Sequence, residues 1–177
     1  MLAAGLVALG LAACGNGQRT SSTAATRTAA PQPAPCAGEG LEGGFSVVRG
    51  SAGAGQIVYR LRLANVSQHR CFLRGIPELR LLAADGTQLS TRVVPEQPGA
   101  LAPVRIDLVP GGSASATARF SPDVPGVGEG TTGRCEPVAA RLRVRPAGGG
   151  VVEVPVRPPT PVCEHGRLAF RAFSGSS

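Results

Sequence analysis

The sequence predicts an all-β protein, a sandwich of antiparallel strands with two disulfides. Three observations lead to this expectation. From residue 36 onward, short apolar runs alternate with turn signals, in a chain that contains 25 Gly and 16 Pro. No stretch of helical length repeats its apolar residues with a helical period. Four cysteines are spread over the same region, as in exported domains, where disulfides persist.

The chain begins with a segment that predicts an export signal. Residues 2–13 form an uncharged apolar run that is too short for a membrane-spanning helix. The run ends in Leu11, Ala12 and Ala13, and Cys14 follows directly. This junction resembles a bacterial lipobox, which implies a signal peptide over 1–13 and acylation of Cys14. The run lacks the positive charge that usually precedes it, so an upstream or misassigned start stays open. An ordinary secreted protein with an incidental Cys14 is the alternative.

Residues 14–35 then predict a lipidated cysteine followed by a tether. The tract consists mainly of Ser, Thr, Ala, Pro, Gly and Gln, with only two arginines. It cannot bury enough apolar surface to offset the entropy of ordering it, so we expect it to be disordered. The folded domain is expected over 36–177, which is long enough for one sizeable core.

Alternation of apolar and polar residues places the strands of this domain. In the clearest run, 56–65, one face carries Ile57, Tyr59, Leu61 and Leu63. Two other runs alternate likewise, with expected inward residues Val104, Ile106 and Leu108, and Val138, Ala140, Leu142 and Val144. The expected strands are 45–48, 56–65, 70–73, 78–82, 104–109, 113–120, 138–145, 151–156 and 168–173. Strands with one apolar side need a second packed layer, which predicts a sandwich.

The five cysteines predict two disulfides and one modified thiol. Lipidation accounts for Cys14, and the remaining four allow three pairings. We favour Cys36–Cys71 and Cys135–Cys163, because these close the two local loops. No Cys-x-x-Cys spacing is present, so no metal site is expected.

The basic net charge is compatible with an anionic partner but does not indicate nucleic acid. The net charge is +7, and all 18 basic residues are arginine, as in chains from GC-rich genes. One Tyr, five Phe and no Trp make a poor stacking platform, so nucleic acid is not an expected partner. Alternation puts the side chains of Arg141, Arg143 and Arg145 on one strand face, and those of Arg60 and Arg62 on another. These five form a candidate face for an anionic ligand if the strands are neighbours. A plain solvated face, partly paired with Glu153, is the alternative.

Catalysis is not expected. The chain has two histidines, His69 and His165, each close to a cysteine and both expected near one end of the sandwich. No Gly-x-Ser-x-Gly elbow is present, and the 11 acidic residues are scattered singly. The run 50–55 is Gly-rich but lacks the Lys-Ser/Thr of a phosphate loop, so a turn is expected there. The sequence thus favours a protein that is not an enzyme and has no cofactor.

The stretch from Asn65 to Pro77 resembles the signature of a known family. Its spacing of Asn65, Cys71, Leu73, Gly75 and Pro77 is similar to that of the domain of unknown function 4232, found largely in actinobacterial cell-envelope lipoproteins. The similarity covers residues 36–173 and includes Pro110, Gly111, Cys135 and Cys163. It implies an immunoglobulin-like β-sandwich and brings no catalytic residues.

Two functions are therefore expected of a protein exported to the outer face of the cytoplasmic membrane. The first is a lipid-anchored envelope protein whose non-catalytic sandwich is a binding module. Its partners would be the membrane, through the anchor, and an anionic wall polymer or another envelope protein. The alternative is a structural or accessory envelope lipoprotein without a ligand.

Overall fold

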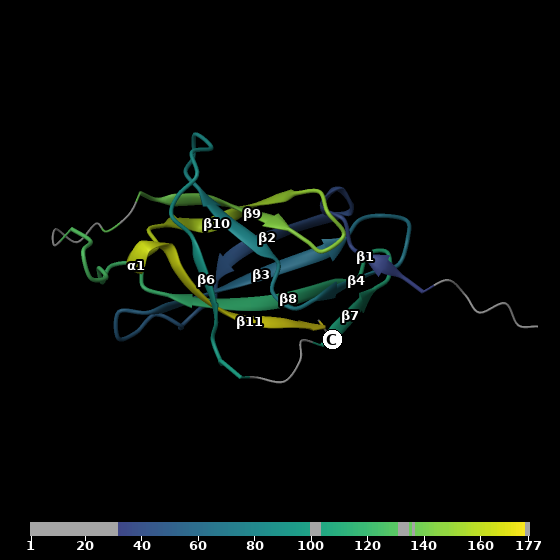
Figure 1. Cartoon of the computed structure of the whole chain (residues 1–177), viewed down its shortest axis with the longest axis horizontal. Helices are drawn as coiled ribbons and strands as arrows, with labels where there is room; N and C mark the ends of the chain where they lie inside the picture. The colour runs from purple at the N-terminus through teal and green to yellow at the C-terminus, as the bar shows by residue number, and fades with distance from the viewer. Residues whose placement is uncertain (1–31, 100–103, 131–134, 136, 176–177) are drawn as a thin grey trace, which may run out of the picture. The chain divides into compact units, whose positions relative to one another are not determined.

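A computed structural model describes residues 32–99, 104–130, 135 and 137–175 of the chain (Figure 1). The expected signal, Cys14 and the tether up to residue 31 lie outside the described residues. Strands make up nearly all the regular secondary structure of the described part, as the sequence predicts; its short helical elements are the 3-10 turn Gly38–Gly40 and α1 (Cys163–Gly166). No helix in this part is long and apolar enough to cross a membrane. The strands are β1 (Ala34–Pro35), β2 (Leu41–Val47), β3 (Ile57–Asn65), β4 (Cys71–Arg74), β5 (Glu78–Leu82), β6 (Arg92–Pro95), β7 (Arg105–Leu108), β8 (Ser113–Phe120), β9 (Ala139–Arg145), β10 (Val152–Thr160) and β11 (Arg167–Gly175).

The strands form two sheets. The larger has eight strands in the order β5-β9-β10-β2-β3-β8-β11-β6, and the smaller has the order β1-β4-β7. The chain passes directly from β5 to β6, which stand at opposite ends of the large sheet. Just before β6, the N–H of Leu89 donates to the carbonyl of Leu81 at 2.9 Å, and Thr91 accepts from the Leu81 N–H. These bonds join the two ends of the sheet, so it curls around its inner face like a barrel.

Three strand pairs are parallel, where the sequence led us to expect antiparallel strands only. They are β1 with β4, β10 with β2, and β11 with β6. In each pair the two strands are far apart in sequence, so a long crossover can bring them together in the same direction. Alternation predicts which side of a strand is buried, but it carries no information on strand direction.

Alternation predicts the core correctly along β3. Tyr59, Leu61 and Leu63 are fully buried, and the Tyr59 ring packs against Phe45 and Phe120. The Phe45 ring in turn stacks on Phe170. The Tyr59 hydroxyl donates to the carbonyl of Pro158 at 2.9 Å, so its buried polar atom is satisfied. Burial raises the pKa of Tyr59 above its usual value, although a hydrogen bond with Thr160 lowers it.

The expected inward positions are wrong at two strand starts. Val104 is 66% exposed and Val138 is 49% exposed, because each lies before the first residue of its strand. Ala139 is buried instead of Val138. The register of β10 against β9 shifts between Pro155 and Thr160, which changes the face that β9 presents at this end.

Both favoured disulfides are present, and they lie at opposite ends of the domain (Figure 1). Cys36–Cys71 joins the start of the domain to β4 with a Cα–Cα distance of 4.8 Å. Ala34 and Pro35, which were expected in the tether, pair with β4 as strand β1. Cys135–Cys163 has a Cα–Cα distance of 5.2 Å. The compact unit that begins at Gln32 contains the hydrophobic core and both disulfides.

Candidate functional site

The three arginines of β9 share one outward face, as alternation predicts, and they are paired with acids. Glu153 of β10 stands directly opposite Arg143, and its carboxylate is 2.7 Å from Arg143 and 3.4 Å from Arg141. On the other side, Glu78 of β5 stands opposite Arg145 at 3.7 Å. The expected partner Glu153 is therefore present, and each of the three arginines contacts an acid, although the two acids neutralise only part of the positive charge.

The two arginines of β3 lie elsewhere on the same sheet. Two strands, β10 and β2, separate β3 from β9, so the five arginines do not form one patch. Arg60 and Arg62 are exposed, and within the described residues no carboxylate lies within 4 Å of either guanidinium. The condition for one concentrated patch, that the two strands are neighbours, is not met, because alternation predicts a face but not the order of strands.

Small residues flank these two arginines on both sides. Arg62 stands between Gly44 of β2 and Ser115 of β8. Arg60 stands between Ser46 and Thr117 on the same two strands. Together with Val47 and Val48, the residues Gly44, Ser46, Arg60 and Arg62 line a shallow depression of about 260 Å³.

Sequence reasoning missed a third arginine of this surface. Arg157 of β10 pairs with Ser46, so it points to the same side as Arg60. The expected strand ended at Val156, because two prolines follow Arg157, whereas β10 continues to Thr160. The sequence did offer a sign of this position. Residues i and i+4 of a strand share a face, so a strand that continues past Val156 places Arg157 on the same outward side as Glu153. We refer to the following surface residues as the Arg60 face: Gly44, Ser46, Arg60, Arg62, Ser115, Thr117 and Arg157.

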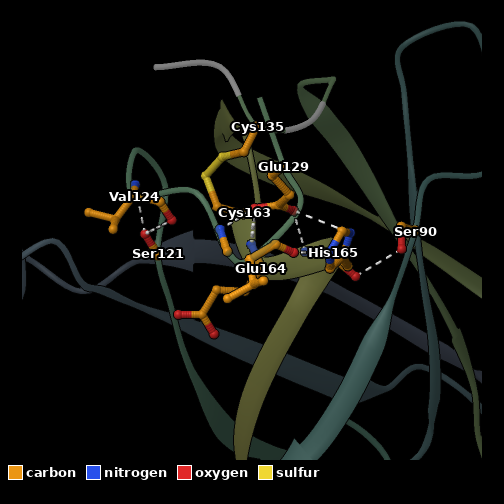
Figure 2. Close-up of polar contacts among 10 residues, drawn as sticks. Ser90, Ser121, Val124, Glu129, Cys135, Cys163, Glu164 and His165 are labelled. Carbon is orange, nitrogen blue, oxygen red and sulfur yellow. Dashed lines mark hydrogen bonds and ion pairs between the residues drawn. A yellow bond between two sulfur atoms is a disulfide. The ribbon is translucent and has the colours of Figure 1, made fainter. Parts of the chain in front are cut away.

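A second cluster of polar groups lies beside the Cys135–Cys163 disulfide (Figure 2). The Glu129 side chain, 2% exposed, accepts hydrogen bonds from the backbone N–H groups of Gly126 at 2.5 Å, of Glu164 at 2.8 Å, and of His165. Burial raises the pKa of the Glu129 carboxyl, but these bonds and the nearby His165 imidazole lower it by more, so the pKa lies below its usual value. Glu129 therefore acts as an internal anion that holds two loops together.

The backbone of α1 is shaped to meet this carboxylate. Glu164 and His165 both have φ 56°, a left-handed conformation that turns their adjacent N–H groups toward Glu129. The carbonyl of His165 accepts the Ser90 hydroxyl at 2.8 Å, as Figure 2 shows. Sequence reasoning missed Glu129, because a lone acid in a Gly-rich loop gives no sign of a partner 35 residues away.

The two histidines lie at opposite ends of the domain, although they were expected near one end. His165 is part of α1, whereas His69 precedes β4 (Figure 1). Beside His69, the buried Asn65 side chain donates to the carbonyls of His69 at 2.8 Å and Leu108 at 3.2 Å, and accepts from the Ser67 N–H. Asn65 therefore has a structural role as the cap of this turn.

The fold and its sites define an all-β sandwich with a disulfide at each end and an outward arginine surface. A family model described as "Domain of unknown function (DUF4232)" matches residues 36–174. The chain belongs to this family. No curated protein and no solved structure matches the chain.

Proposed function

We propose that this protein is a lipid-anchored component of the cell envelope whose sandwich domain is a non-catalytic interaction module. The observation that carries the proposal is the combination of two disulfides in the domain with a lipobox-like junction at Cys14. Disulfides persist outside the reducing cytosol, and the junction supplies an anchor on the outer face of the cytoplasmic membrane. The tract between Cys14 and β1 would hold the domain away from the lipid surface.

The environment of the polar groups supports interaction rather than catalysis. Glu129 uses its carboxylate oxygens to bind backbone N–H groups of two loops. The His165 ring is 3.1 Å from the carbonyl of Val127, and Asn65 caps a turn. Each of these groups has a structural partner, whereas the Arg60 face presents charged groups to solvent. A surface of this kind is suited to holding an anionic partner.

One observation favours the second candidate, a structural or accessory lipoprotein without a ligand. Each arginine of β9 forms an ion pair with Glu78 or Glu153, as on an ordinary solvated surface. Under this alternative, the Arg60 face would have no ligand either. The two candidates therefore differ in whether the intact domain retains a partner from the envelope.

The anchor is tested by metabolic labelling with palmitate and by fractionation of cells. The native protein should take up label and sediment with membranes. Cys14→Ala should abolish the labelling and release the protein, while Ser22→Ala in the same tract should change neither. Labelling that persists in the Cys14→Ala variant would contradict the lipid anchor.

The compartment is tested by mass mapping of the protein under non-reducing conditions. Peptides joining Cys36 to Cys71 and Cys135 to Cys163 are expected. Free thiols at all four positions in protein taken from cells would remove the argument for export. The interaction itself is tested by cross-linking in cells, in which the accessory alternative predicts no specific partner.

A further inference from the structure

We propose that the Arg60 face binds a linear polyanion whose oxyanion groups are separated by hydroxylated units. This inference rests on the proposed function, because it names the surface and the ligand chemistry of the interaction module. Three properties of the face support the binding of such a polymer: its uncompensated charge, the spacing of its arginines, and the small polar residues between them.

The first property is charge. Within the described residues, Arg60, Arg62 and Arg157 have no carboxylate within 4 Å, although the β9 arginines of the same sheet have two. A guanidinium presents paired N–H donors whose geometry matches a phosphate or a carboxylate. Three such groups without an acidic partner leave a positive surface that an external anion can neutralise.

The second property is spacing. Arg60 and Arg62 are two residues apart on β3, so their Cα atoms are about 7 Å apart along the strand. Arg157 and Arg60 are separated by one strand, which places them about 10 Å apart across the sheet. Charges at such intervals match repeated anionic groups better than one small anion.

The third property is the alternation of charge with hydroxyl groups. Pairing across five adjacent strands aligns one row of residues, and its members are Arg157, Ser46, Arg60, Thr117 and Arg171. Every second position is an arginine, and the positions between are hydroxyl residues, which both donate and accept hydrogen bonds. Arg171 is bound to Glu96 at 3.0 Å, so the uncompensated part of the row ends at Thr117. A polymer that alternates oxyanions with hydroxylated units complements this row.

The shape of the face favours such a polymer over a membrane surface. Gly44 and Ser46 leave the depression of about 260 Å³ between the arginines, which a flexible chain can enter. Membrane-surface binding usually adds apolar side chains that enter the lipid. The large apolar side chains that are exposed in the described residues, such as Val66, Val104 and Val127, lie outside the Arg60 face.

The test uses the oxidised unit from Gln32 to Ser177, which contains the whole core and both disulfides. Binding is measured by calorimetry at low salt with poly(glycerol phosphate) and with polygalacturonate, which distinguish phosphate from carboxylate. Dextran is the uncharged control, and vesicles containing phosphatidylglycerol represent a membrane. We expect binding of at least one polyanion, no binding of dextran, and weakening as salt rises, because exposed charges are screened.

Two variants with the same loss of charge locate the site. Arg60→Gln/Arg62→Gln/Arg157→Gln should weaken polyanion binding at least about tenfold, because it removes the three guanidinium groups that hold the anionic groups of the polymer. Arg141→Gln/Arg143→Gln/Arg145→Gln removes the same charge from the paired arginines and should weaken binding much less. A third variant, Gly44→Leu, keeps every charge and fills the depression. The nearest atom to a Cβ at Gly44 is the Ser46 Oγ at 3.9 Å, so the strand accommodates it, and binding should fall.

The outcomes separate this inference from the proposed function. Equal weakening by the two triple variants would show that only net charge matters and would overturn the inference. Binding to vesicles without binding to either polymer would overturn it in favour of a membrane surface. Absence of binding to all probes would also overturn it. None of these results changes the anchoring experiment on Cys14, whose failure alone would overturn the lipid anchor.

Discussion

The carboxylate of Glu129 accepts the backbone N–H of Glu164 at 2.8 Å, across 35 residues of chain. The bond joins the loop after β8 to α1, next to the Cys135–Cys163 disulfide (Figure 2). One end of the sandwich is therefore held by a covalent bond and by an ionised side chain with several N–H donors. This arrangement makes the stability of that end depend on pH.

We predict that the protein loses stability in acid through Glu129. The pKa of Glu129 is lowered from the ordinary value of 4.5, so the ionised form stabilises the folded state above that pH. This contribution is lost as the pH falls through the lowered pKa, because the protonated carboxyl accepts these bonds poorly. Thermal melts from neutral to acidic pH should show Glu129→Gln destabilised at neutral pH and converging on the native protein in acid.

Asp123→Asn is the matched control for this prediction, because Asp123 is an exposed acid of the same loop. It should follow the native melting curve at every pH. A constant difference between Glu129→Gln and the native protein down to the most acidic pH would contradict the role given to the charge.

Gly166 should tolerate no side chain. It has φ 71°, and a Cβ there would clash with the backbone oxygen of Ser90. We expect Gly166→Ala to lower the free energy of unfolding by about 3 kcal/mol, because strain and a displaced backbone add together. Gly128 also has a left-handed φ, but no atom lies within 4 Å of its Cβ position. Gly128→Ala should therefore cost only about 1 kcal/mol. Equal losses in urea titrations would refute the close-approach argument.

Asn65 should be essential for stability at the other end of the domain. Asn65→Ala removes a buried side chain and leaves the carbonyls of His69 and Leu108 and the N–H of Ser67 without this partner. Unsatisfied buried polar groups cost about 1–3 kcal/mol each, so we expect a loss of about 2–4 kcal/mol. Ser67→Ala removes a hydroxyl at the exposed side of the same turn and should cost under about 1 kcal/mol. Denaturant titrations that rank the two variants in the reverse order would contradict this role.

Local sequence patterns predict which face of a strand is buried better than they predict which strands lie next to each other. Tyr59, Leu61 and Leu63 are buried as expected, because burial on one side follows directly from alternation. The strand order separates Arg60 from Arg141, because pairing between distant strands depends on long-range packing. Strand β6 was not expected, since it is short and ends in Pro95, and its place comes from a parallel pair with β11.

The features of the candidate sites also divide into those that local sequence spacing predicts and those that depend on distant parts of the chain. Local spacing was enough to favour Cys36–Cys71 and Cys135–Cys163 and to identify Glu153 as a partner of the β9 arginines. The binding partners of Glu129 could not be predicted from the sequence. They are backbone N–H groups, and their direction depends on the left-handed conformation of residues far along the chain. Arg157 was not expected on this face, because the two prolines that follow it suggested that the strand ended before it.

Glu153 should stabilise the sheet by offsetting the charge of two β9 arginines. Glu153 is 31% exposed and contacts both Arg141 and Arg143, while Arg80 of β5 stands opposite Arg143 on the other side. Like charges directly opposite each other destabilise a sheet, so Glu153 should offset their repulsion. We expect Glu153→Gln to lower the free energy of unfolding by about 0.5–1 kcal/mol at low salt, the range of partly exposed ion pairs.

Salt distinguishes this effect from lost packing. Because the interaction is between partly exposed charges, the cost of Glu153→Gln should shrink as ionic strength rises, whereas a packing defect would persist. Glu42→Gln on β2 is the control, since Glu42 is an exposed acid with no ion pair among the described residues, and it should shift stability by less than about 0.5 kcal/mol. A double-mutant cycle with Arg143→Gln then measures the coupling directly. A coupling energy near zero at low salt would mean that the pair contributes nothing, and that strand packing alone holds the β9 arginines in place.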